Sequence, residues 1–443
     1  MTIEELLALA HSQDVEFVDL RYAFFPGRWQ HHTITLSELE RHFQTGHPIV
    51  PGGPGDQPAH ALQPDPQTAV VDPFCQHPTM AVVCDLLDVH TRQAHPADLR
   101  GVARRTAAVL QGDHAADQAA LGAVVECYVF DQVSFEQSSH TAGYRVDCRE
   151  GAWRRGRDEP DNLGTQLPPR CGEGCLPPGD TLHNLRGEMT AALLAGGVPA
   201  VGHYHAAGAG QIGFELSLTS LLEAADQLMQ TRYILRNAAA RQGKVATFMP
   251  KPLAGDAGSR MVLRLSMSRG GVPLFATDSA GRFSEWGRHA VGGLLTHAGG
   301  LSALLRPTTN SYRGGPEEED SRRLVTAVLS DGVLEIAGAD PTCQPYLAYS
   351  AVVLAALDGI ERRLEPSVPI ENPVPLVAAF AGEVDDLETA LHALQEDHEY
   401  LLRGAAWTDE LVHRWIEYKL EHEVRPLRRY PHPYEFSLYF GVC

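Results

Sequence analysis

The sequence has no long hydrophobic run and little positive charge. No stretch approaches the roughly 20 apolar residues that a helix needs to cross a bilayer, and the opening MTIEELLALAHSQD is acidic where a secretory signal would be basic and then apolar. The 443 residues carry 36 Lys and Arg against 56 Asp and Glu, a formal net charge of -20. A chain this acidic repels phosphate backbones. We therefore expect a cytoplasmic protein that binds neither membranes nor nucleic acid.

Cysteine is also sparse, with eight residues in the whole chain. That number is too small for a disulfide scaffold. The only close pair, Cys171 and Cys175, has no second pair at zinc-site spacing. We interpret the cysteines as reduced structural thiols. The chain does have 44% hydrophobic residues, enough for about two or three domains with their own cores.

The hydrophobic pattern divides the chain into a short β-rich part and a longer mixed part. Alternating residues predict strands within 15–25 and 69–88, and the dense Pro and Gly of 47–67 predict a long surface loop. Helical spacing with caps predicts helices from residue 98 onward. The sequence therefore predicts an α+β fold with domains 1–97 and 98–443. The expected helices are 2–13, 98–112, 180–197 and 217–243, and the other expected strands lie in 123–136, 198–205, 245–252 and 259–276.

Eight short strings occur in order along the chain. They are FVDLR (17–21), PGRWQH (26–31), VDPF (71–74), EGAW (150–153), ATFMPKPLAGDAGS (246–259), RPTTNSY (306–312), DPTCQPYLAYSA (340–351) and PHPYEF (431–436). Together they resemble a bacterial type I glutamine synthetase, from residue 5 to residue 443. The resemblance implies an N-terminal β-grasp domain and a catalytic domain on a curved antiparallel sheet flanked by helices. It also implies active sites between subunits of a ring, so we expect a homo-oligomer, either a hexamer or a dodecamer.

The resemblance implies a reaction, but most of the residues that bind its metal ions and substrates are replaced in this chain. In the family, ATP phosphorylates the glutamate γ-carboxylate, ammonia displaces the phosphate, and clustered carboxylates hold divalent cations. On the first metal-bearing strand Glu126 is kept, but its partner position holds Val124. Alignment on Ala-Gly-Gln places His205 and Gly213 at two further carboxylate positions.

The nucleotide and substrate positions are replaced as well. The family's metal-binding and nucleotide-binding histidines correspond to Val262 and Arg264, and its phosphate-binding arginine near Glu335 corresponds to Ala337. The subunit-facing aspartate that assists ammonium binding falls at Phe24. We therefore do not expect ordinary ATP-dependent glutamine synthesis, nor ATP and Mg²⁺ as cofactors.

Two interpretations of the altered site stay open. In the first, Arg260 and Arg264 lie two strand positions either side of Val262 and share one face. Their positive charges would replace metal ions beside Glu126 and Glu335, which gives a metal-free pocket.

In the second interpretation, His203 and His205, which form a His-x-His pattern, bind a metal together with Glu126. Glu335 is a further candidate ligand. Imidazole and carboxylate ligands suit a transition metal better than Mg²⁺. This hypothesis makes these four residues metal ligands of an unknown cofactor.

Two functions follow from the altered site. The first is a repurposed enzyme, in secondary metabolism for example, that acts on a small amino acid or carboxylate and a nitrogen compound. Glu126 would then be an acid/base or metal group, and Arg260 and Arg264 would bind the carboxylate. The alternative is a catalytically silent pseudoenzyme that serves as a structural or regulatory oligomer.

Overall fold

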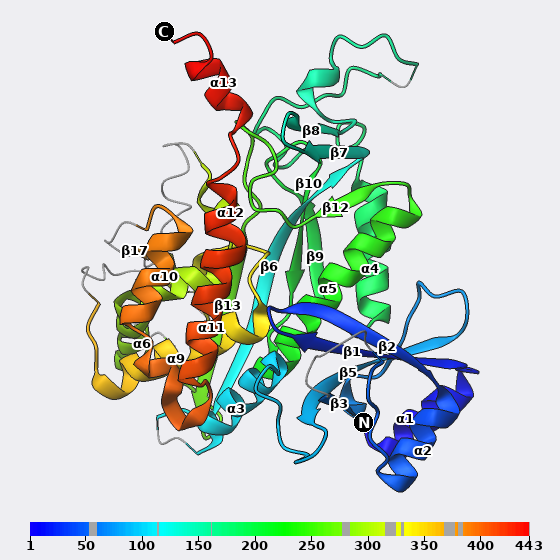
Figure 1. Ribbon diagram of the computed structural model, residues 1–443, viewed down its shortest axis with the longest axis vertical. Helices are drawn as coiled ribbons and strands as arrows, with labels where there is room; N and C mark the ends of the chain where they lie inside the picture. Colours follow the sequence, from blue (N-terminus) through cyan, green and yellow to red (C-terminus); the bar gives the residue numbers. More distant parts are fainter. Residues whose placement is uncertain are drawn as a thin grey trace.

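Two β-sheets organise the protein, and helices cover one face of the larger sheet (Figure 1). The computed structural model describes residues 1–52, 60–112, 115–160, 162–276, 284–314, 325–328, 332–366, 377–379 and 384–442. The architecture is α+β with antiparallel pairing throughout the larger sheet, as the sequence predicts. A separate hairpin consists of β7 (Gln132–Gln137) and β8 (Ala142–Asp147).

The smaller sheet has five strands and belongs entirely to the N-terminal part of the chain. Its order is β2-β1-β5-β3, with β4 on β5, and β1 runs parallel to β5. A capping box at Thr2 starts α1, and both side chain and backbone of Thr2 exchange hydrogen bonds with Glu5. The elements are α1 (Ile3–Ser12), β1 (Phe17–Phe24), β2 (Arg28–Thr35), α2 (Leu36–Thr45), β3 (His60–Pro64), β4 (Val70–Val71) and β5 (Thr79–Asp88).

Strand β3 corrects the prediction of one long loop over 47–67. Residues 60–64 pair antiparallel with β5 and are mostly buried, while 53–59 lie outside the described residues. A strand of five residues between Pro-rich segments carries little local signal. The residues with which it pairs lie 20 to 28 positions further along the chain, so pairing with β5 decides its structure.

The larger sheet has ten strands around the long central strand β6 (Gln118–Phe130). The order is β17-β15-β16-β13-β6-β10-β9, with β11 and β12 also on β6 and β14 on β13. The other strands are β9 (Ala200–His205), β10 (Gln211–Leu216), β11 (Thr219–Ser220), β12 (Val245–Thr247), β13 (Met261–Arg269), β14 (Val272–Pro273), β15 (Val325–Val328), β16 (Leu334–Ala339) and β17 (Val377–Ala379).

One face of this sheet forms the core against the helices. Along β6, Leu121, Ala123, Val125 and Cys127 are fully buried and pack in the main hydrophobic cluster, because strand residues alternate between faces. The remaining α-helices of the described residues are α3 (Leu99–Gln111), α4 (His183–Ala195), α5 (Leu221–Arg241), α6 (Glu285–Thr296), α7 (Ala298–Leu305), α9 (Pro345–Arg362), α10 (Leu387–Glu396), α11 (Asp409–Lys419), α12 (Arg425–Leu427) and α13 (Pro433–Tyr439), of which α12 and α13 have no buried residue. The opposite face of the sheet is only half-buried, and we call it the open face.

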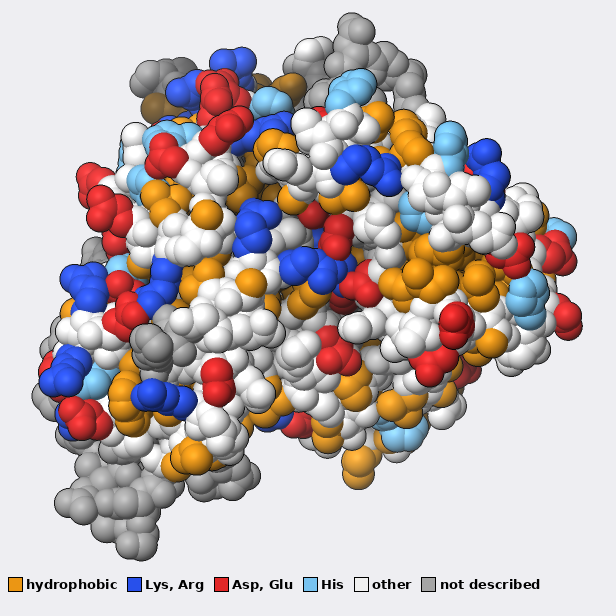
Figure 2. All heavy atoms as spheres, turned by 90° about the horizontal axis from the view of Figure 1, so that it is seen from below, with side chains coloured by type: hydrophobic (Ala, Val, Ile, Leu, Met, Phe, Trp, Pro, Cys, Tyr) orange, Lys and Arg blue, Asp and Glu red, His pale blue; other side chains and the backbone are white. Residues whose placement is uncertain are grey.

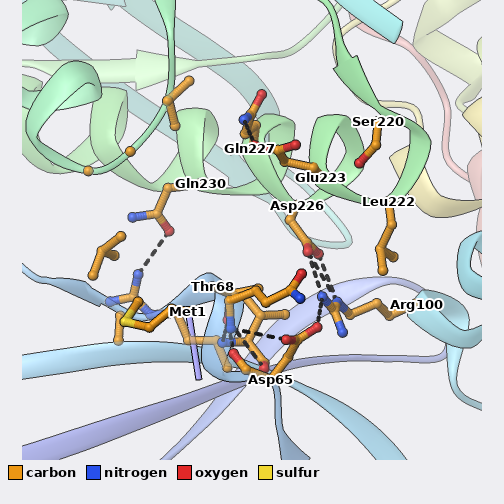
Figure 3. Close-up of a pocket in the computed structure, with 18 residues that line it drawn as sticks. Met1, Asp65, Thr68, Arg100, Ser220, Leu222, Glu223, Asp226, Gln227 and Gln230 are labelled. Atoms are coloured by element: carbon orange, nitrogen blue, oxygen red, sulfur yellow. Dashed lines mark hydrogen bonds and ion pairs between the residues drawn. The ribbon is translucent and has the colours of Figure 1, made fainter. Parts of the chain in front are cut away.

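Buried ion pairs join the smaller sheet to α5. The Arg100 guanidinium contacts Asp65 at 2.8 Å, Asp85 at 2.7 Å and Asp226 of α5 at 2.7 Å. Figure 3 shows Arg100, Asp65 and Asp226 converging at the edge of a cavity of about 330 Å³. The two sheets share no strand in the described residues, and the domain boundary at 97/98 stays a prediction.

Within the described residues, helices of sufficient length and apolarity to span a bilayer are lacking. On the face shown in Figure 2, acidic, basic and hydrophobic side chains are interspersed. The acidic excess of the sequence is therefore not gathered into one patch on this face. The cytoplasmic location stays a prediction from the sequence.

Candidate functional site

The open face of the larger sheet carries most of the predicted site residues. Register places Gly213 of β10 opposite Glu126 of β6 on one side and opposite Tyr204 of β9 on the other. Arg264 of β13 lies opposite Glu335 of β16. Because paired residues of an antiparallel sheet point to the same side, these groups share the open face.

The Glu126 carboxylate is the centre of this face. It is 2% exposed and accepts four hydrogen bonds. Tyr204 Oη donates to Oε1 at 3.0 Å, and Gln211 Nε2 donates to Oε2 at 3.1 Å. Arg260 donates twice, from its backbone N to Oε2 at 3.0 Å and from Nη2 to Oε1 at 3.2 Å. Both oxygens are thus occupied by donors from the chain itself, and the charge is compensated by Arg260.

Tyr204 fills the space that a side chain at position 213 would need. A Cβ added to Gly213 would lie 2.1 Å from Cζ of the Tyr204 ring. The glycine therefore lets the phenol cross β10 and reach Glu126. Burial, followed by the Glu126 charge, raises the pKa of the Tyr204 hydroxyl, which keeps it a proton donor at neutral pH.

Arg264 is held between two carboxylates. Its Nε donates to Glu335 Oε1 at 2.9 Å, and its Nη1 contacts Glu215 Oε1 of β10. The three side chains together carry a charge of -1, so Arg264 is neutralised by its own neighbours. Arg260 differs, because 63% of its side chain is exposed. Of the two predicted anion-binding arginines, Arg260 is the more exposed to solvent.

The structure does not bring the four predicted metal ligands together, so this part of the prediction is wrong. His203 and His205 alternate with Tyr204 along β9 and point to the other face of the sheet. His205 Nε2 lies 2.9 Å from Glu150 Oε2, and its Nδ1 lies 2.7 Å from the Ala206 carbonyl. His203 Nδ1 accepts from Arg186 Nε at 3.2 Å. Glu126 and Glu335 remain on the open face.

His205 belongs instead to a buried cluster with Glu150 and Asp180. Among the described residues, this is the one group of three potential ligands whose atoms lie within 4.8 Å of one another. Arg186 binds both oxygens of Asp180, at 2.8 and 2.6 Å. Thr181 and Gly210 donate backbone hydrogen bonds to Glu150, each at 2.7 Å. With its oxygens already paired, we interpret this cluster as a structural cross-link between the 150–181 segment and β9.

The residues on the open face do not fit a divalent cation. A hard cation requires several carboxylate oxygens, but Val124 and Gly213 have no side-chain ligand atom. Glu126 already accepts four hydrogen bonds. Glu215 and Glu335 are both paired with Arg264. Sequence reasoning missed Tyr204 and Glu215. Strand alternation could have found them, since each occupies an open-face position beside a residue that was considered.

Comparison with known proteins identifies the family to which this chain belongs. The chain matches the family described as "Glutamine synthetase, catalytic domain" over residues 96–315 and 322–439. It is 36% identical over 469 residues to a glutamine synthetase of Frankia alni, with 99% of each chain covered. It is also 36% identical over 474 residues to that of Mycolicibacterium smegmatis, covering 100% of this chain and 99% of the relative. The cryo-EM structure of Plasmodium falciparum glutamine synthetase has a TM-score of 0.88 at 19% identity, with 99% of each chain covered.

The chain therefore belongs to the glutamine synthetase family. It is a divergent member, because Val124, His205 and Gly213 stand where the sequence resemblance places carboxylates. The relatives carry the plain name of the family, and the distinctive features of this chain lie in the contacts of its open face.

Proposed function

We propose that this protein does not perform ordinary ATP-dependent glutamine synthesis and that its open face is a metal-free site. The observation that carries this proposal is the Glu126 carboxylate, which is saturated by Arg260, Tyr204 and Gln211. A divalent cation would have to displace these donors and find further ligands where Val124 and Gly213 lie. Removing one transition-state contact typically lowers the rate of a reaction by about 10²–10³-fold. When several catalytic residues act together, losing one of them removes most of the rate enhancement that they supply as a group.

The function best supported by this geometry is that of a catalytically silent structural or regulatory oligomer. The C-terminal segment supports assembly, because several of its large aromatic and aliphatic side chains are exposed to solvent. Exposed apolar side chains gathered on one segment are typical of interaction sites. A second copy of this chain is the partner that we propose, in a ring of the kind the sequence predicts. The exposed residues are Tyr434 (64%), Phe436 (57%), Phe440 (83%) and Val442 (72%).

One observation favours a second candidate, the repurposed enzyme. The exposed Arg260 guanidinium lies beside the Tyr204 hydroxyl, and both contact the same carboxylate. An arginine with free donors can bind a substrate carboxylate in a bidentate manner. In this second candidate, Arg260 binds the carboxylate of an amino acid. Glu126 and Arg264 balance the charges of the site, and no metal takes part.

The first experiment measures glutamine formed by the purified oligomer from glutamate, ammonium and Mg-ATP. A glutamine synthetase from Frankia alni, treated identically, is the positive control. We expect no product above the no-enzyme blank and no saturable uptake of Mg-ATP in calorimetry. Glutamine formation together with tight nucleotide binding would contradict the proposal.

The second experiment separates the two candidates. Glutamate binding is titrated by calorimetry with the native protein, with Arg260→Gln and with Arg41→Gln, a variant of an exposed arginine on α2. The silent oligomer predicts no binding by any of them. Binding that weakens about tenfold or more in Arg260→Gln alone would favour the repurposed enzyme.

A further inference from the structure

A second cavity, of about 710 Å³, lies away from the open face. It is bounded by the β1–β2 turn, by the C-terminal half of α5, by β12 and by α11. Its volume falls within the range of small-molecule sites. Its lining includes the aromatic side chains of Trp29, Phe248 and Tyr418.

Three arginines line this cavity: Arg28, Arg232 and Arg236. Arg232 and Arg236 are four residues apart on α5, so they lie on the same side of the helix. Like charges at this spacing repel each other. In the described residues, none of the three forms an ion pair with a carboxylate.

The contacts that these arginines do make are neutral. Arg232 Nη2 donates to the Cys343 carbonyl at 2.7 Å, and its Nη1 lies 3.7 Å from the Met229 sulfur. The Arg236 guanidinium lies 5.4 Å from the centre of the Phe248 ring. Burial, and then the charges of Arg232 and Arg28, lower the pKa of Arg236. The other cation in the lining, Lys419, is already paired with Glu423.

We propose that this cavity binds a small organic polyanion that carries phosphate or carboxylate groups. Arg232 is half-buried, and Arg28 and Arg236 are exposed at the cavity. The three guanidinium groups therefore form a positive cluster without a carboxylate partner among the described residues, and an anion in the cavity would provide the counter-charge. The planar fork of arginine matches both phosphate and carboxylate oxygens. The aromatic side chains offer an apolar surface for the remainder of such a ligand. This proposal is independent of the proposed function, because none of its residues belongs to the open face.

The test is calorimetric titration of the full-length protein with sodium pyrophosphate and, separately, with citrate, in metal-free buffer of constant ionic strength. The variants are Arg28→Gln and Arg236→Gln. Arg41→Gln is the control for net charge, and Arg264→Gln is the control for the open face. We expect the dissociation constant of the favoured anion to rise at least about tenfold in both cavity variants. It should change less than about twofold in both controls. Preference for pyrophosphate or for citrate identifies the class of ligand.

A thermal unfolding measurement without anion distinguishes a binding role from a structural one. If the arginines await a ligand, removing one relieves repulsion, and the cavity variants unfold at the same temperature as the native protein or higher. Three results would overturn the proposal: no saturable binding of either anion, weakening confined to Arg264→Gln, or lower unfolding temperatures in both cavity variants.

Discussion

At the scale of the residue, Tyr204 and Gly213 depend on each other. The absence of a side chain at position 213 leaves room for the Tyr204 ring, and the hydroxyl then completes the shell of donors around Glu126. A single small residue thus determines which group contacts the buried carboxylate. Two predictions test this pair.

Tyr204→Phe should lower the free energy of unfolding by about 1.5–3 kcal/mol. The ring stays in place, but Glu126 loses one of its four donors, and a hydrogen bond to a charged group contributes about this much. Urea denaturation measures the change. Tyr144→Phe on β8, whose side chain is exposed, is the matched control and should be neutral. Equal effects of the two variants would show that the Tyr204 hydroxyl is not coupled to Glu126.

Gly213→Ala should destabilise the protein by about 1–3 kcal/mol, because the new methyl group overlaps the Tyr204 ring. In the Tyr204→Ala background the same substitution should cost much less. A double-mutant cycle with urea denaturation gives the coupling energy. Additive effects would mean that the two residues do not compete for this space.

At the scale of the element, one histidine links the α6–α7 junction to two further helices. His297 lies between α6 and α7, with Nε2 2.9 Å from Asp358 of α9 and Nδ1 2.7 Å from Asp397 at the end of α10. Both ring nitrogens can donate to carboxylates only when the imidazole is protonated. Burial alone would lower the pKa of His297, but the hydrogen bonds to the two aspartates outweigh it and raise the pKa.

His297→Gln should therefore destabilise the protein in a pH-dependent way. A raised folded-state pKa stabilises the fold fully below the unfolded value of about 6.5, and this stabilisation is lost as the pH rises through the folded-state pKa. We expect a deficit of about 2 kcal/mol at pH 6 that shrinks toward pH 9, measured by urea denaturation. His413→Gln, an exposed histidine beside Asp409 on α11, should show little change. A deficit that grows with pH would contradict the assignment.

At the scale of the whole molecule, Arg100 connects the smaller sheet to the helical layer. Its side chain is 1% exposed and contacts Asp65, Asp85 and Asp226, the last of which also accepts from Tyr346 Oη at 2.7 Å. Residues from both parts of the chain thus share one buried charge. Breaking this network leaves uncompensated carboxylates at the contact.

Arg100→Lys should lower the free energy of unfolding by about 3 kcal/mol, because one ammonium cannot satisfy three carboxylates at fixed positions. Arg104→Lys is the matched control, since Arg104 contacts Asp65 and Asp85 from a half-exposed position. It should change stability by less than about 1 kcal/mol. Both changes are measured by urea denaturation. Equal effects would show that burial of Arg100 does not increase its contribution to the free energy of unfolding.

Much of the fold could be predicted because its signals are local or sequential. The helical periods of α3 and α5 lie within the segments that form them. Eight short strings in the right order indicated the family. The prediction of β3 failed because its pairing partner is distant in sequence. For the site, the first interpretation placed Arg260 and Arg264 beside Glu126 and Glu335, and the structure has both contacts. The second interpretation combined the two glutamates with His203 and His205, which point to the other face of the sheet.

The sequence by itself determined which side-chain ligand atoms are missing, since Val124 and Gly213 have none. Only the tertiary structure decided what replaces them. Strand alternation turned His205 toward Glu150 and Tyr204 toward Glu126, and strand register placed Glu215 and Glu335 on either side of Arg264. The sequence determines which side chains a site contains. The pairing of their charges depends on neighbours that only the folded sheet brings within hydrogen-bonding distance.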